Sequence, residues 1–158
     1  MYYLSNMLKI FIDADGCPVK EETYKVAARY QLKVWVVANK YMNIPLHPLI
    51  EMMVVNAGPD EADNWIADHI EVNDICITND IPLADRCLKK DAKVLNTRGE
   101  EFDEDMIGNA MATRDLMKQL REAGQIMGGP PPMEKRDRSN YLGSLDRIIQ
   151  MIKKRTDK

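Results

Sequence analysis

Aspartates follow several apolar runs of this sequence, at positions where their carboxylates could bind a divalent cation. The acids concerned are Asp13, Asp15, Asp60, Glu61, Asp63, Asp80 and Asp85. Carboxylates that converge in a partly dry site repel one another, so they either take up protons or are neutralised by a cation. Oxygen ligands suit Mg²⁺ or Mn²⁺. Such ions activate water and stabilise charge on phosphoryl oxygens, so the pattern predicts metal-assisted phosphodiester hydrolysis.

The same acids also stand near predicted helix starts, where aspartate is a common N-cap. Capping uses one acid per helix, whereas each junction here carries two or more. Asp63 argues most strongly against capping alone, because it lies about 70° from the centre of its helix's apolar stripe, beside Ile70. Asp85 lies on the outer flank of its helix and is weaker support for a site. For each acid taken singly, both interpretations stay open.

Strand and helix patterns that could bring these acids together alternate along the chain. We expect strands at Lys9–Ile12, Lys33–Ala38, Met52–Asn56, Ile75–Thr78 and Lys93–Leu95. Helices are predicted from Pro18 to Tyr30, Pro59 to Ile70, Ile81 to Lys90 and Asp103 to Ala123, and over a last amphipathic segment with Leu142, Leu145, Ile148, Ile149 and Ile152. The class is α/β, three-layer, with a mainly parallel sheet flanked by helices and two extra C-terminal helices. The carboxyl ends of parallel strands share one edge, where ligands bind.

Composition places the chain among globular proteins of one domain, residues 1–158, with a Gly/Pro-rich connector at 124–138 before the last helix. No apolar run approaches the roughly 20 residues of a membrane span. The three cysteines form no C-x-x-C pair, which favours the reducing cytoplasm.

Charge is distributed unevenly along the chain. Residues 135–158 hold eight Lys/Arg against three Asp, whereas residues 1–134 hold 14 basic and 22 acidic residues. The basic tail could bind phosphate, or it could be the solvated face of a terminal helix. The C-terminal helices either wrap the sheet or carry a partner, a second copy of the chain included.

Six segments in order, over nearly the whole chain, resemble the YaiI/YqxD family of bacterial proteins. They read "IDADGCPVK", "GPDEADNWIADHI", "ITNDIPLADRCLKK", "LNTRGE", "RDLMKQLREAG" and "GGPPPMEKRDRSNYLGSLDRI". The fold of that family is thought to be similar to PIN-like nucleases, whose acidic edge binds Mg²⁺ or Mn²⁺ and cuts RNA. The resemblance therefore implies a divalent-metal-dependent ribonuclease.

The resemblance also implies roles by position. Asp13 would match the acid that ends the first strand, Asp80 the acid after the fourth, and Asp85 the further acid that often follows. The helix-borne acid of PIN-like nucleases is commonly Glu, whereas here Asp60, Glu61 and Asp63 compete, and we prefer Asp63 for its inward face. The expected catalytic set is Asp13, Asp63 and Asp80, and the expected metal set adds Asp15, Asp60 and Asp85. Arg98, Arg136 and Arg138 are candidates for gripping phosphate, against an ordinary surface role.

Two other functions fit parts of the sequence. "DADG" after a strand also looks like the start of haloacid-dehalogenase-like phosphatases, in which Asp13 would attack phosphorus and Asp15 would transfer protons. Those enzymes generally insert a flap after this motif, and Pro18 leaves no space for one. The other alternative is a non-catalytic module that binds RNA or protein through its C-terminal helices.

Overall fold

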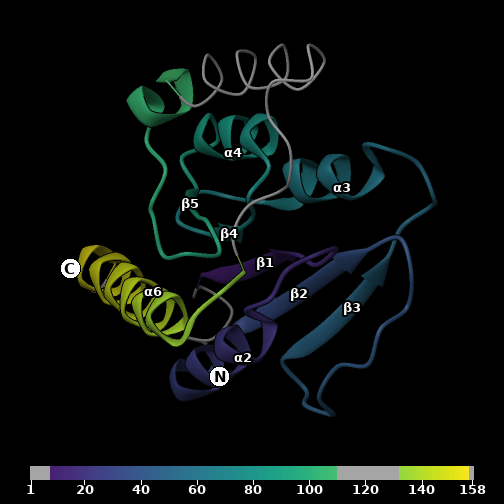
Figure 1. Ribbon diagram of the computed structural model, residues 1–158, viewed down its shortest axis with the longest axis horizontal. Helices are drawn as coiled ribbons and strands as arrows, with labels where there is room; N and C mark the ends of the chain where they lie inside the picture. Colours follow the sequence, from purple (N-terminus) through teal and green to yellow (C-terminus); the bar gives the residue numbers. More distant parts are fainter. Residues whose placement is uncertain (1–7, 110–131, 157–158) are drawn as a thin grey trace.

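The computed structural model describes residues 8–109 and 132–156 (Figure 1). Its elements are β1 (Lys9–Asp13), α2 (Lys20–Tyr30), β2 (Lys33–Ala38), β3 (Ile50–Val54), α3 (Glu61–His69), β4 (Ile75–Ile77), α4 (Ile81–Leu88), β5 (Lys93–Leu95) and α6 (Lys135–Thr156). Residues 104–109 are helical and begin the helix predicted over Asp103–Ala123. The rest of that helix, and residues 124–131 of the predicted connector, lie outside the described residues. The sequence predicts a connector that reaches residue 138, but α6 already begins at Lys135.

The five strands form one parallel sheet in the order β3-β2-β1-β4-β5. The chain runs outward from β1 through β2 to β3 and then returns to place β4 on the other side of β1. Strand order therefore reverses between β1 and β4. In open α/β sheets such a reversal leaves a crevice at the carboxyl ends of the two strands, and ligands bind there. The predicted α/β fold with a parallel sheet is confirmed.

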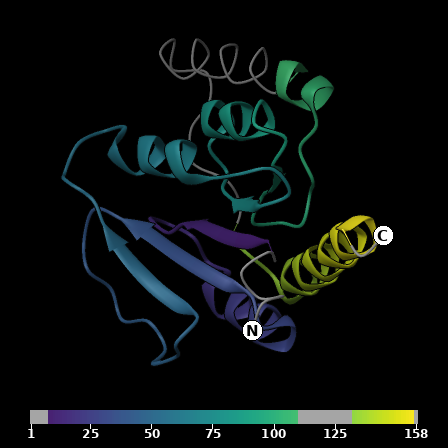
Figure 2. The same ribbon diagram turned by 180° about the vertical axis from the view of Figure 1, so that it is seen from behind.

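Helices cover both faces of the sheet, with α2 and α6 on one side and α3 and α4 on the other (Figures 1 and 2). Successive side chains of β1 alternate between the two cores, because strand residues point to opposite faces. Ile10 and Ile12 pack with α2 and α6, whereas Phe11 packs with α3 and α4. Burial on both faces explains why the strands read as continuous apolar runs.

One strand is displaced from its predicted position. The sequence predicts a third strand at Met52–Asn56, but β3 begins at Ile50 and ends at Val54. Pairing with β2 sets these bounds, since Val34 lies opposite Ile50 and Ala38 opposite Val54. Register with a neighbouring strand is a tertiary property that propensity alone does not carry.

The terminal helix α6 wraps the sheet, which is one of the two alternatives that the sequence left open. Leu145, Ile148, Ile149 and Ile152 are buried against the face that α2 also covers, and the Tyr141 hydroxyl lies 2.5 Å from Oγ1 of Thr23 on α2. The expected contact with a second copy of the chain stays a prediction. No helix within the described ranges is long and apolar enough to cross a membrane.

Candidate active site at the carboxyl ends of β1 and β4

A cavity of about 490 Å³ lies at the point where the strand order reverses. Its lining comes from the loops that follow β1, β4 and β5. The lining residues are Asp13, Asp15, Gly16, Cys17, Thr78, Asn79, Asp80, Ile81 and Thr97. Three of the predicted acids therefore meet in one cavity, as the edge rule for parallel strands requires.

A tight turn after β1 positions the first two of these acids. The Cys17 amide donates to the Ala14 carbonyl at 3.2 Å, and Gly16 has a φ of 73°. A positive φ at the third position of a four-residue turn is the reason for glycine there. The Lys20 ammonium donates to the Cys17 carbonyl at 2.7 Å and holds the turn against α2. Asp15, within the turn, is exposed, whereas Asp13, at the end of β1, is half-buried.

Thr78 links the ends of β1 and β4. Its hydroxyl donates to Oδ2 of Asp13 at 2.8 Å and accepts from the Asp80 amide at 2.9 Å. Burial raises the pKa of Asp13, the Thr78 hydrogen bond opposes this rise, and the charges of Asp80 and Asp15 add to it. No donor within the described residues reaches Oδ1 of Asp13. One carboxylate oxygen is therefore fixed and the other is available to a ligand.

Asp80 is both an N-cap and a cavity residue. Its Oδ1 accepts from the Leu83 amide at 2.9 Å, so the capping interpretation is correct for this oxygen. The other oxygen, Oδ2, receives no hydrogen bond from the part of the chain that the structure describes. Because Asp80 lines the cavity, one side chain serves both purposes. The two interpretations of the sequence were therefore not exclusive.

Asp63 reaches the same group of charges from α3. Burial raises its pKa to about 6, with the charges of Asp80, Asp13 and Asp60 adding to the rise and Arg86 opposing it. Although Asp63 does not line the cavity, its charge is coupled to two acids that do. Asp60 is the N-cap residue of α3, yet its side chain makes no capping hydrogen bond. The helix-borne acid preferred from the sequence, Asp63, is thus the one with the strongly perturbed pKa.

The carboxylates do not form a closed metal cage. Within residues 8–109 and 132–156, no three His, Cys, Asp or Glu side chains are grouped closely enough to hold an ion. Mg²⁺ commonly keeps several waters and uses only one or two protein carboxylates together with substrate phosphates. The free oxygens of Asp13 and Asp80 fit that open kind of binding, and they do not fit a structural zinc site.

Asp85 and Glu61 are not brought into the cavity. Asp85 lies one turn into α4, where its Oδ2 is 2.9 Å from the Lys89 ammonium in an i,i+4 pair. Glu61, the first residue of α3, is exposed. The structure thus brings Asp13, Asp15 and Asp80 into the cavity and couples the charge of Asp63 to two of them, whereas Asp60, Glu61 and Asp85 do not line the cavity.

Comparison with known proteins places the chain in a family. Residues 11–151 match the family described as "Uncharacterized BCR, YaiI/YqxD family". The chain belongs to the YaiI/YqxD family. Similar proteins are UPF0178 proteins of Paramagnetospirillum magneticum (55% identical, covering 94% of this chain and 98% of that one), Rhodospirillum rubrum (51%, 93% and 99%) and Gluconobacter oxydans (49%, 96% and 87%). No solved structure matches.

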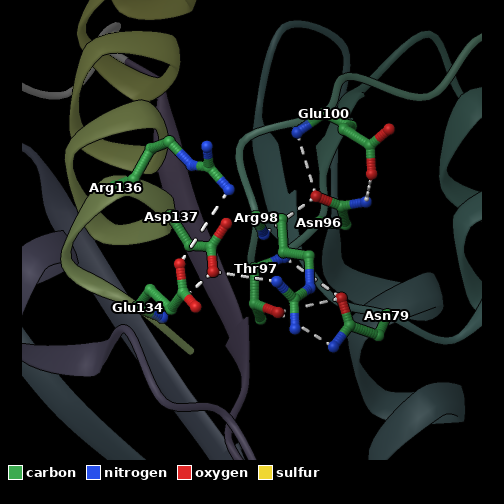
Figure 3. A network of polar contacts seen from close by, with 8 residues as sticks. All are labelled: Asn79, Asn96, Thr97, Arg98, Glu100, Glu134, Arg136 and Asp137. Atoms are coloured by element: carbon green, nitrogen blue, oxygen red, sulfur yellow. Dashed lines mark hydrogen bonds and ion pairs between the residues drawn. The ribbon is translucent and has the colours of Figure 1, made fainter. Parts of the chain in front are cut away.

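The arginines expected to grip phosphate have different environments in this YaiI/YqxD protein, and Figure 3 shows two of them, Arg98 and Arg136. Arg98 pairs with Asp137 at 2.9 Å, and Arg138 donates to the Pro18 carbonyl at 2.6 Å and to Glu22 at 3.0 Å. Both side chains therefore fasten α6 to the loops beside the cavity. Arg136 is exposed, with Glu134 3.9 Å away. It is the arginine of the three that best fits an external phosphate.

Sequence reasoning missed three polar residues of the cavity, Thr78, Asn79 and Thr97. The Asn79 amide oxygen accepts from the Thr97 amide at 3.1 Å, and its nitrogen donates to the Thr97 hydroxyl at 3.0 Å, so the loops after β4 and β5 are joined. Thr78 carried a usable signal, because a hydroxyl stands between a buried strand and an aspartate in "ICITND". The Asn79–Thr97 pair carried no such signal in the sequence, because it joins two loops whose residues are 18 positions apart.

Proposed function

We propose that this YaiI/YqxD protein is a phosphodiester hydrolase that uses Mg²⁺ or Mn²⁺ and acts on RNA. The observation that supports the proposal is the meeting of Asp13 and Asp80 in one cavity at the reversal of strand order, with the charge of Asp63 on α3 coupled to both. Perturbed acids in a cleft are typical of functional sites. The resemblance to PIN-like nucleases supplies the substrate class.

Each residue of the site has a distinct part in this proposal. Asp13 and Asp80 hold the ion through the carboxylate oxygens that the protein leaves free, and Thr78 keeps the Asp13 carboxylate oriented. When bound, the ion lowers the pKa of a water and offsets charge on the phosphate. Asp63 accepts the proton of the attacking water. We place the reaction in the cytoplasm, where the three buried cysteines stay as free thiols.

One observation favours the non-catalytic alternative, a module that binds RNA or protein. The described residues hold no preformed group of three metal ligands of the kind that many metal enzymes have. The phosphatase alternative gains no comparable support. After Asp15 the chain makes one turn and enters α2 at Lys20, which leaves no length for a flap.

Metal binding and cleavage test the proposal together. A ligand at 100 times its dissociation constant stabilises a protein by about 2.7 kcal/mol, so saturating Mn²⁺ should raise the melting temperature of the wild-type chain measurably. We expect Asp13→Asn and Asp80→Asn to abolish this shift and any cleavage of RNA. Asn caps a helix as well as Asp does, so Asp80→Asn leaves α4 capped and its loss of function is not a folding effect.

Asp85→Asn is the matched control, because this acid lies on the same helix and outside the cavity. It should keep both the Mn²⁺ shift and the cleavage. Undiminished cleavage by Asp13→Asn would show a contaminant or another site. A protein that binds RNA but neither shifts with Mn²⁺ nor cleaves would be the non-catalytic module.

A further inference from the structure

The terminal helix α6 turns its acids inward and exposes most of its bases. Asp137 accepts from Arg98 at 2.9 Å and from the Glu134 amide at 3.0 Å. Asp146 accepts from the Tyr30 hydroxyl on α2 and from Gln150. The two acids of α6 within the described residues are therefore engaged in contacts within the protein. The bases that remain on its surface are not neutralised by them.

Three of those bases form a straight ridge. Arg136, Arg147 and Lys154 are exposed and lie 11 and 7 residues apart, which places them within about 20° of one line along a helix. The line spans about 27 Å and runs opposite the buried stripe that packs on the sheet. Exposed positions between them, Asn140, Gly143 and Gln150, carry no charge. Among the described residues, Arg147 and Lys154 form no ion pair with a carboxylate.

The ridge begins beside the cavity. Arg98 follows Thr97 and Pro18 follows Cys17, and both Thr97 and Cys17 line the cavity. Through Arg98–Asp137 (Figure 3) and Arg138–Pro18, the first turn of α6 is bonded to both lining loops. At its other end α6 reaches a second cavity, where Arg155 lies with the start of β5. The ridge thus leads from the carboxyl edge of the sheet to its amino edge.

Gly99 lets the loop after β5 lie directly against the backbone of α6. It has a φ of 89°, and a Cβ there would lie 2.9 Å from the carbonyl carbon and oxygen of Asn140 on α6. The loop after β5 therefore packs backbone against backbone on the helix. The position of the ridge relative to the cavity is set by rigid contacts rather than by a linker.

We propose that the ridge of Arg136, Arg147 and Lys154 binds the phosphates of a single RNA strand whose next segment enters the cavity. This inference rests on the proposed function for the placement of the cleaved bond. Residues 1–134 carry a formal charge of −8, so a polyanion is repelled from the body and attracted to the basic line of α6 that adjoins the site. Three side chains spread along about 27 Å suit a repeating phosphate backbone better than a compact anion.

Salt dependence of RNA binding tests the ridge without catalysis. Binding of a fluorescent single-stranded RNA of about 15 nucleotides is measured in EDTA for the wild type and for the R136Q/R147Q/K154Q variant. Each phosphate contact contributes about 0.7 to the slope of log K against log salt for single strands. The slope should therefore fall by about 2 in the variant. Between 50 and 200 mM salt, wild-type affinity should drop about 20-fold more than that of the variant.

The control is K25Q/K40Q/K89Q, which removes the same charge from exposed positions outside α6 and should keep the wild-type slope. Equal slopes for the wild type and the ridge variant would overturn the inference, as would an equal loss in the control. So would polyglutamate that competes as well as RNA, because the ridge would then recognise any acidic chain. Melting temperatures equal to wild type show that both variants are folded.

Hydrolysis of a dinucleotide with Mn²⁺ separates this inference from the proposed function. The dinucleotide reaches the cavity but not the ridge, so the ridge variant should cleave it at the wild-type rate while cleaving the long RNA more slowly. A slope difference without hydrolysis by any variant would support the ridge and refute the catalytic proposal. If the ridge variant hydrolyses both RNAs at wild-type rates and has the wild-type salt slope, the catalytic proposal would be supported and the ridge would be refuted.

Discussion

Replacing Asp63 by Asn should stabilise the metal-free protein at pH 7.5. The pKa of Asp63 is about 6 in the folded chain against the ordinary 3.8, mainly because of burial and then because of the charges of Asp80 and Asp13. This difference corresponds to at most about 3 kcal/mol between the two protonation states. Asp63 is only half-buried, and solvent screening reduces the expected effect to about 1 kcal/mol. For a chain of this length that is about 2–4 °C in melting temperature.

The direction of the pKa shift determines the pH range in which Asp63→Asn stabilises the protein. A raised pKa means that the folded state binds the proton more tightly than the unfolded state. The stability supplied by protonated Asp63 is therefore fully present below about pH 3.8 and is lost as the pH rises through about 6. The amide introduced by Asp63→Asn cannot ionise, so the free-energy difference between variant and wild type should be near zero below about pH 3.8, should grow as the pH rises from about 3.8 to about 6, and should reach its plateau above pH 7. Urea unfolding in EDTA at pH 4.5, 6 and 7.5 measures it.

Asp85→Asn is the control with the opposite sign. It removes the exposed pair with Lys89, which should cost about 0.3–0.5 kcal/mol at neutral pH. Mn²⁺ should shrink the advantage of Asp63→Asn, because a bound cation relieves the repulsion that the substitution removes. A destabilised Asp63→Asn at pH 7.5, or an advantage that does not change with pH, would refute the coupling of Asp63 to the other acids.

Three further substitutions test the framework around the site. Thr78→Val should destabilise the protein by about 1–3 kcal/mol and raise the pKa of Asp13 further, because the hydroxyl that donates to the Asp13 carboxylate is lost. Carboxyl NMR titration measures this pKa, and an unchanged value would contradict the contact. Gly99→Ala should lower the free energy of unfolding by at least about 1–3 kcal/mol, because it places a side chain at a positive φ and against the Asn140 backbone. Thermal unfolding measures this loss, and an unchanged melting temperature would show that α6 is not docked there. Tyr141→Phe should cost about 1 kcal/mol in urea unfolding by removing the hydrogen bond to Thr23, whereas a neutral result would mean that this buried contact is not formed.

The order and type of the elements followed from local patterns. Two strands, β2 at Lys33–Ala38 and β5 at Lys93–Leu95, have the predicted bounds, because runs of β-branched and apolar residues that are buried on both faces encode a strand locally. The alternation of strands with helices then required a parallel sheet. That rule alone placed Asp13 and Asp80 at one edge, although they are far apart in sequence.

Only the folded chain decided what those acids touch. Strand order is set by packing between distant segments, and it alone put β4 beside β1 and Thr78 against Asp13, 65 positions away. The same holds for Arg138, whose partners Pro18 and Glu22 lie 120 and 116 positions before it. Periodicity reports which face of an element is apolar, but it does not report which element meets that face. The residue types of the site were therefore readable from the sequence, whereas its geometry depended on contacts between segments that no local pattern relates.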